Sequence, residues 1–152
     1  MSWLGSKKKA QAQVLPSRRE IQKAMMIIGC GMMAISEDDR SGAVTRIKTG
    51  AGRMPLFANN TTEEDEDILS EAAEEFDEDP QATVERAAGV LVQTGWHAAA
   101  FCYACDIMLA DGEIEDNEFV LLGEYAQYLR IKEDEAEAMR VTFRTYYQLF
   151  EG

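Results

Sequence analysis

The sequence is poor in the residues that most often build catalytic and metal sites. It has one histidine, His97, and three cysteines in 152 residues. It contains no Glu-x-x-His motif, so the ligand pattern of a di-iron helical bundle is missing. His97 has no serine or cysteine beside it that would support base–nucleophile catalysis, and packing at a helix start is the better interpretation. We therefore predict a protein that is not an enzyme.

Basic residues are also scarce. Lys and Arg number 15 against 28 Asp and Glu, and the formal net charge is −13. Nucleic acids and anionic membranes attract basic surfaces, so we expect neither nucleic-acid binding nor direct membrane insertion. The charge instead favours cations or a protein partner with a basic surface, a membrane-associated partner included. A homodimer is a further possible state.

No apolar run is long enough to span a bilayer. The longest candidate, "AMMIIGCGMMAI" (Ala24 to Ile35), is too short, although it resembles the core of a signal peptide. The polar "RREIQK" before it reads as the start of a helix, so we expect a buried helix here, with a signal peptide as the alternative. The odd number of cysteines and the lack of a secretory signature predict a reducing compartment, the cytoplasm.

Strand-like alternation is absent, and apolar residues recur at helical spacing. We predict an all-α fold of six to seven helices in one domain over residues 17–152, after a mobile, basic tail over residues 1–16. Helix starts are marked by two capping boxes and by an aspartate followed by proline. These signals are Ser17 with Glu20, Thr61 with Glu64, and Asp79 with Pro80.

The predicted helices differ in the clarity of their pattern. The expected ranges are 17–36, 61–79, 80–94, 96–110, one starting at 115 or 116, and a last one after "RIKED". The segment around Val44, Ile47 and Ala51 has helical spacing, but its glycines weaken the prediction. Gly29 and Gly31 lower helix stability and would let another helix approach closely.

One predicted helix is strongly acidic. Between Glu63 and Asp79 the chain carries many acids and no Lys or Arg. The ordinary interpretation is a solvated helix face, and the alternative is a face that binds a cation or a partner.

Cys102 and Cys105 form a Cys-x-x-Cys pair in the middle of an apolar helix. A thioredoxin-like pair instead has its first cysteine at a helix start. A zinc site needs four ligands, and the only candidates besides Cys102 and Cys105 are Cys30 and His97. We expect buried, inert thiols. The alternative function is reduction or sequestration of a metalloid by Cys102 and Cys105.

The stretch "CDIMLADGEIEDNEF" (Cys105 to Phe119) resembles the second half of an EF-hand loop. With Gly112 at loop position 6, the first two ligand positions fall on the apolar Ile107 and Leu109, which excludes a full EF-hand. The acidic turn remains a candidate cation site, with calcium the best match for its oxygen ligands. Its candidate ligands are Asp111 and Glu118, with Glu113, Glu115 and Asp116 as weaker ones. The ordinary interpretation of these residues is that they build the turn, and cation binding is the alternative.

An internal repeat relates the two halves of the chain. "AISEDDRSGAVTRIKTGAGRMPLF" and "LADGEIEDNEFVLLGEYAQYLRI" align without a gap, with Ser36 opposite Asp111. Most of the match is in apolar spacing, which predicts two related helix–turn–helix units that share one core. A structural assembly subunit is a further functional alternative for such a helical fold.

The stretch "MLADGEIEDNEFVLLGEYAQYLRI" resembles the signature of the TerB-like tellurite-resistance family. The resemblance implies an all-helical fold of two related halves and a non-enzymatic role in bacterial metal and stress resistance. It also implies metal binding by acidic turn residues, which here are Asp111 and Glu118. In the first half Ser36 and Ala43 stand at the corresponding places, so a paired two-turn site is not expected.

Overall fold

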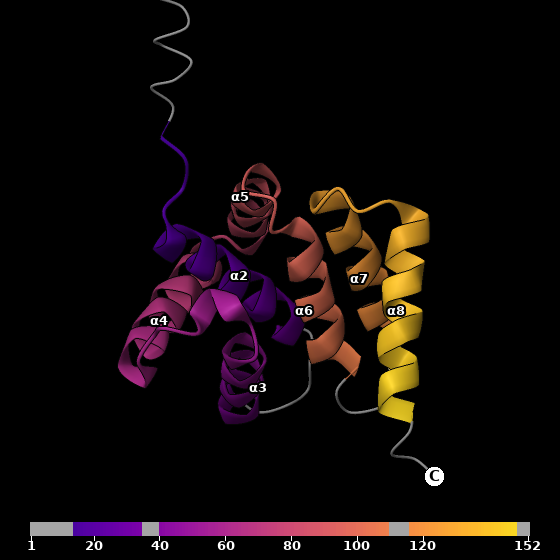
Figure 1. Cartoon of the computed structure of the whole chain (residues 1–152), viewed down its shortest axis with the longest axis horizontal. Helices are drawn as coiled ribbons and strands as arrows, with labels where there is room; N and C mark the ends of the chain where they lie inside the picture. The colour runs from indigo at the N-terminus through magenta and orange to yellow at the C-terminus, as the bar shows by residue number, and fades with distance from the viewer. Residues whose placement is uncertain (1–13, 35–39, 110–115, 149–152) are drawn as a thin grey trace, which may run out of the picture.

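The computed structural model describes residues 14–34, 40–109 and 116–148. These residues form an all-α fold without strands, as predicted, with seven α-helices and one 3₁₀ turn (Figure 1). In chain order the elements are α2 (Arg18–Met33), α3 (Arg40–Gly52), η1 (Pro55–Phe57), α4 (Thr62–Glu78), α5 (Pro80–Gln93), α6 (His97–Leu109), α7 (Asp116–Tyr128) and α8 (Glu133–Gln148).

Helix α2 lies at the centre of the fold, against α3, α4, α5 and α6 (Figure 1). Every residue from Ala24 to Met33 is buried, which confirms the buried-helix prediction for the apolar run. A helix surrounded by other helices can be apolar on all sides. No helix in the described ranges has the length and apolar character needed to cross a membrane.

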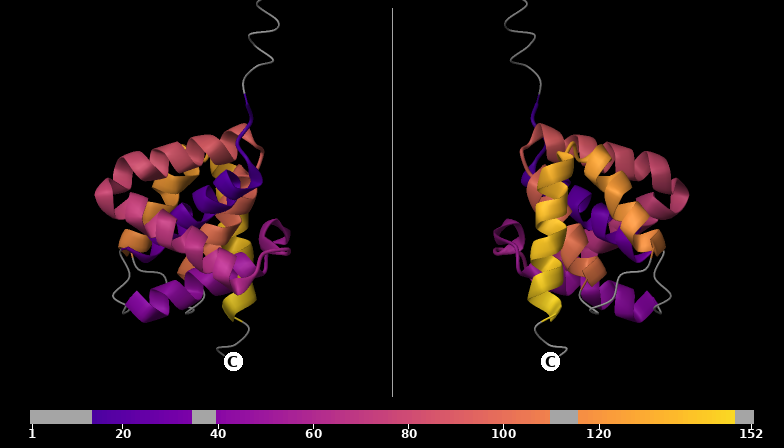
Figure 2. Two further views of the ribbon diagram at one scale, coloured as in Figure 1. Left: turned by 90° about the vertical axis from the view of Figure 1, so that its left-hand side faces the viewer. Right: turned by 90° about the vertical axis from the view of Figure 1, so that its right-hand side faces the viewer.

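The predicted helix starts are confirmed. The Ser17 hydroxyl accepts a hydrogen bond from the Glu20 backbone N–H at 3.1 Å. Thr61 and Glu64 form a complete capping box at α4. Asp79 caps α5, and α4 and α5 meet at a corner there (Figure 2). The α5–α6 turn contains Gly95, whose φ of 79° favours glycine.

Two helix boundaries differ from the prediction. Helix α2 ends at Met33, whereas we expected it to reach Ser36, which is outside the described residues. Helix α3 covers Arg40–Gly52, longer than its weak pattern indicated. Packing overrides propensity in α3, because Ile47 and Ala51 are buried against the core.

Glycines bring α2 and α3 into close contact with two tyrosines. The side chain of Tyr103 on α6 lies against Gly29 and Gly50, where an added Cβ would be 2.7 Å from tyrosine atoms at both positions. The Tyr103 hydroxyl donates a buried hydrogen bond of 2.9 Å to the Ile47 carbonyl. A Cβ at Gly31 would lie 1.6 Å from the Tyr125 hydroxyl. We expected Gly29 and Gly31 to let another helix approach closely; in the structure the space beside them is instead filled by side chains, chiefly those of the two tyrosines.

These contacts predict opposite effects for two glycine substitutions. Gly31→Ala should destabilise the fold by about 1–3 kcal/mol, because its Cβ overlaps the buried Tyr125 hydroxyl. Gly89→Ala on α5 should stabilise it by about 0.5–1 kcal/mol, since nothing lies within 4 Å of the added Cβ. Urea unfolding followed by circular dichroism measures both. Equal effects of the two substitutions would contradict the packing.

Candidate functional site

The predicted cation ligands are only partly within the described residues. Asp111, Glu113 and Glu115 lie outside them. Asp116 is exposed at the start of α7, and Glu118 is half-buried one residue after Asn117, whose side-chain oxygen accepts the Glu118 backbone N–H at 3.0 Å. Over the described ranges, no group of three or more His, Cys, Asp or Glu side chains is placed to hold a metal ion. Cation binding at this turn therefore stays a prediction.

Calorimetry tests that prediction directly. If the acidic turn binds calcium, titration should give heat with a Kd of about 10⁻⁴–10⁻³ M, and the Asp111→Asn, Glu118→Gln double variant should lose it. The helical circular dichroism spectrum of the variant should stay nearly unchanged. Absence of heat with millimolar calcium, magnesium, manganese or zinc would leave these residues as builders of the turn.

The three thiols lie in surroundings that suppress their reactivity. Burial raises the pKa of Cys30 to about 12, and burial, with the neighbouring Cys102, raises that of Cys105 to about 12. Cys102 is half-buried, and burial raises its pKa as well. Since the thiolate is the reactive form, the raised pKa values oppose a redox role. This environment favours inert thiols over the metalloid-reducing pair.

Thiol labelling in the native protein should therefore be slow near pH 7. Cys102 should react first, because it is the only one of the three that is not fully buried. Cys30 and Cys105 should react only after denaturation or towards pH 12, as the thiolate fraction rises with pH. Mass spectrometry of the labelled protein identifies the site, and fast native labelling of Cys105 would restore the redox alternative.

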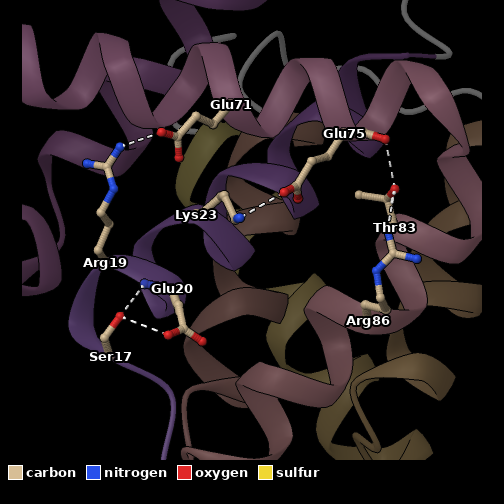
Figure 3. Close-up of polar contacts among 8 residues, drawn as sticks. All are labelled: Ser17, Arg19, Glu20, Lys23, Glu71, Glu75, Thr83 and Arg86. Carbon is tan, nitrogen blue, oxygen red and sulfur yellow. Dashed lines mark hydrogen bonds and ion pairs between the residues drawn. The ribbon is translucent and has the colours of Figure 1, made fainter.

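The acidic helix α4 is held to the core by basic residues along one edge. Arg19 and Lys23 of α2 form ion pairs of 2.8 Å with Glu71 and Glu75 (Figure 3). On the opposite side, Lys48 of α3 pairs with Glu66 at 2.9 Å. These exposed or half-buried pairs contribute little stability each, but they orient the helix.

A row of further carboxylates on α4 lies between these two sets of ion pairs. Within the described residues its members are exposed and have no cationic partner. They are Glu63, Asp67, Glu74, Asp77 and Glu78. Their spacing of three, four and seven residues places them on one helical face. Like charges at such spacing destabilise a helix slightly, so this face would gain from a cationic neighbour.

A groove runs beside this row, between α3 and α4. Its volume is about 530 Å³, and its lining consists of Val44, Lys48, Glu66, Leu69, Ser70, Ala73, Glu74 and Asp77. The apolar floor comes from Val44, Leu69 and Ala73, and the side chain of Val44 is 37% exposed. Acidic residues form much of the rim. The groove therefore combines apolar surface with negative charge.

A second polar cluster joins α3, α6 and α8. Asp106 accepts one hydrogen bond from the Tyr147 hydroxyl and one of 3.1 Å from the Arg53 guanidinium. Burial first, and then the hydrogen bond to Asp106, raises the pKa of Tyr147. Its hydrogen bond to Tyr147 and the charge of Asp106 raise the pKa of Arg53.

Neither the groove nor this cluster was predicted from the sequence. The groove forms only where α3 lies beside α4. The sequence predicts α4 clearly and α3 weakly, and it does not show that the two helices are neighbours. The cluster had one usable signal, since Asp106 is the only acid in the otherwise apolar α6.

Comparisons with protein-family models, curated proteins and solved structures found no match. The resemblance to the TerB-like family thus has no support beyond the residues that carry it, and the function has to be argued from the groove and its charges.

Proposed function

We propose that the chain is a non-enzymatic protein-binding module that holds a basic, amphipathic helix of its partner in the groove between α3 and α4. The observation that carries the proposal is the apolar floor of Val44, Leu69 and Ala73 beneath a rim containing Glu66, Glu74 and Asp77. Amphipathic helices bind in such grooves by placing their apolar face inward. Lysines or arginines at the edges of that face would meet the acidic rim.

The outward carboxylates extend the same interaction. Glu63, Asp67 and Glu78 continue the negative charge along α4 beyond the groove, over the length of a 17-residue helix. A basic helix laid along α4 would therefore face negative charge at several turns. The complementary charges would steer association, and screening by salt would slow it.

The halves of the fold support the proposed TerB-like architecture. Helices α3 and α7 both have 13 residues, and Arg40 aligns in the repeat with Glu115, directly before the start of α7. Aligned positions also share their burial: Ile47 and Leu122 are buried, and Ala51 and Ala126 are buried. Val44 and Phe119 are both exposed. We infer two related helix–turn–helix units.

The resemblance of residues 108–131 suggests the cellular setting. A TerB-like protein would act in a bacterial metal or tellurite stress response, and its basic partner could be attached to a membrane. The free thiols of Cys30, Cys102 and Cys105 agree with a reducing cytoplasm. Binding of a divalent cation at Asp111 and Glu118 would be a means of regulation, since it would change the charge near the start of α7.

A binding experiment with matched variants tests the groove. The probe is a synthetic helical peptide with leucines on one face and lysines at its edges, titrated calorimetrically into the full chain. The Glu74→Gln, Asp77→Asn double variant should bind about tenfold more weakly at low salt, because it loses two ion pairs. The control, Glu85→Gln with Glu124→Gln, removes the same charge from exposed positions on α5 and α7 and should bind as the wild type.

Two further arms separate docking from general attraction. Ala73→Arg places a cation on the groove floor and should weaken peptide binding without unfolding α4, since Ala73 is only half-buried. A peptide with the same lysines but serines in place of leucines should bind weakly. If the Glu74, Asp77 variant and its control lost peptide affinity equally, the effect would come from net charge alone, and docking in the groove would be refuted.

A further inference from the structure

An apolar cavity lies apart from the groove, between α3, α6 and α8. Its volume is about 410 Å³, within the range of about 300–1,000 Å³ typical of small-molecule sites. Met54, Ala99 and Phe143 give it apolar walls, and the rings of Tyr146 and Tyr147 meet edge to face at 5.1 Å between centroids. An apolar or aromatic body of modest size would fit among these side chains.

At the polar end of the cavity, Arg53 has unused hydrogen-bond donors, whereas the acceptor oxygens of Asp106 already have partners. Both oxygens of Asp106 are already engaged, one by the Tyr147 hydroxyl and one by Arg53 Nη1. The Arg53 side chain, in contrast, is 63% exposed, and a guanidinium carries five N–H donors. Its contacts with Asp106 and Tyr147 use only a part of them.

The chain segment that contributes Arg53 to the cavity is basic, although the protein as a whole is acidic. From Arg40 to Thr62 the chain has four basic residues and no acidic one: Arg40, Arg46, Lys48 and Arg53. At physiological salt the Debye length is about 8 Å, so a ligand at the cavity responds chiefly to the charged residues that line it, Arg53 and Asp106. A cationic ligand would have to compete with Arg53 for Asp106, whereas an anion would use the donors that remain.

We propose that this cavity binds a small amphipathic monoanion, a carboxylate on an aliphatic or aromatic body, with the carboxylate on Arg53 and the body between α6 and α8. The Asp106–Arg53 ion pair orients the guanidinium, and the Tyr147 hydroxyl fixes Asp106 in turn. A planar guanidinium can donate two parallel hydrogen bonds to a carboxylate, which explains an arginine at this position. This site is independent of the groove between α3 and α4.

Three eight-carbon probes of equal length test the proposal on the full chain by calorimetry: octanoate, 1-octanol and octylammonium at pH 7. Octanoate should bind about tenfold more tightly than 1-octanol, because only it gains the charge-assisted hydrogen bonds. Octylammonium should bind most weakly. Arg53→Gln should remove the preference for octanoate over 1-octanol. Arg19→Gln, which breaks a similar exposed ion pair with Glu71, should leave the preference intact.

A second variant tests the place of the apolar body. Ala99→Phe fills the cavity from α6 and should weaken octanoate and 1-octanol alike, while a native helical spectrum and a cooperative melt confirm folding. Three results would overturn the proposal: no binding of octanoate at millimolar concentration, tighter binding of octylammonium than of octanoate, or an unchanged octanoate preference in Arg53→Gln. Unchanged binding in a folded Ala99→Phe protein would likewise place the ligand elsewhere.

Discussion

Tyr103 of α6 lies between Gly29 of α2 and Gly50 of α3 and joins the three helices. Its ring occupies space that a side chain at Gly29 or Gly50 would fill, and its buried hydroxyl donates a hydrogen bond to the Ile47 carbonyl. One residue of α6 thus fixes α2 and α3 at the same time. Helix α3 is the weakest helix by sequence, so this contact explains why it is held in place.

The place of α3 determines both candidate binding regions. One side of α3 forms the groove with α4, and its C-terminal end forms the cavity with α6 and α8. Basic and acidic residues are concentrated in different, consecutive parts of the chain here. The segment from Arg40 to Thr62 is basic, the following α4 is acidic, and Lys48 with Glu66 joins them. The two proposals therefore place a cationic partner and an anionic ligand on neighbouring parts of one acidic protein.

Much of the fold could be predicted from local signals. The caps at Ser17, Thr61 and Asp79 mark helix starts because they depend only on the next few residues. The burial of the run after Ala24 followed from its composition. The extent of α3 could not be predicted, because it depends on Tyr103, 53 residues beyond Gly50 along the chain.

The two candidate binding regions were harder to predict for the same reason. Asp106 was noticeable as a lone acid in an apolar helix, but its partners Arg53 and Tyr147 lie on two other helices. The acidity of α4 was evident in the sequence. Whether its acidic face is only solvated or binds a partner could not be decided from the sequence, because the binding interpretation depends on the apolar floor of the neighbouring groove. That floor requires Val44 to lie next to Leu69 and Ala73.

Chemical-shift mapping tests whether a basic amphipathic helix docks between α3 and α4. The full chain, labelled with ¹³C at its alanine and valine methyl groups, is titrated with the leucine–lysine peptide. The methyl groups of Val44 and Ala73 should shift strongly, and that of Ala99 in the separate cavity should not. Shifts concentrated at Ala99, or small shifts spread over the whole acidic surface, would contradict the account.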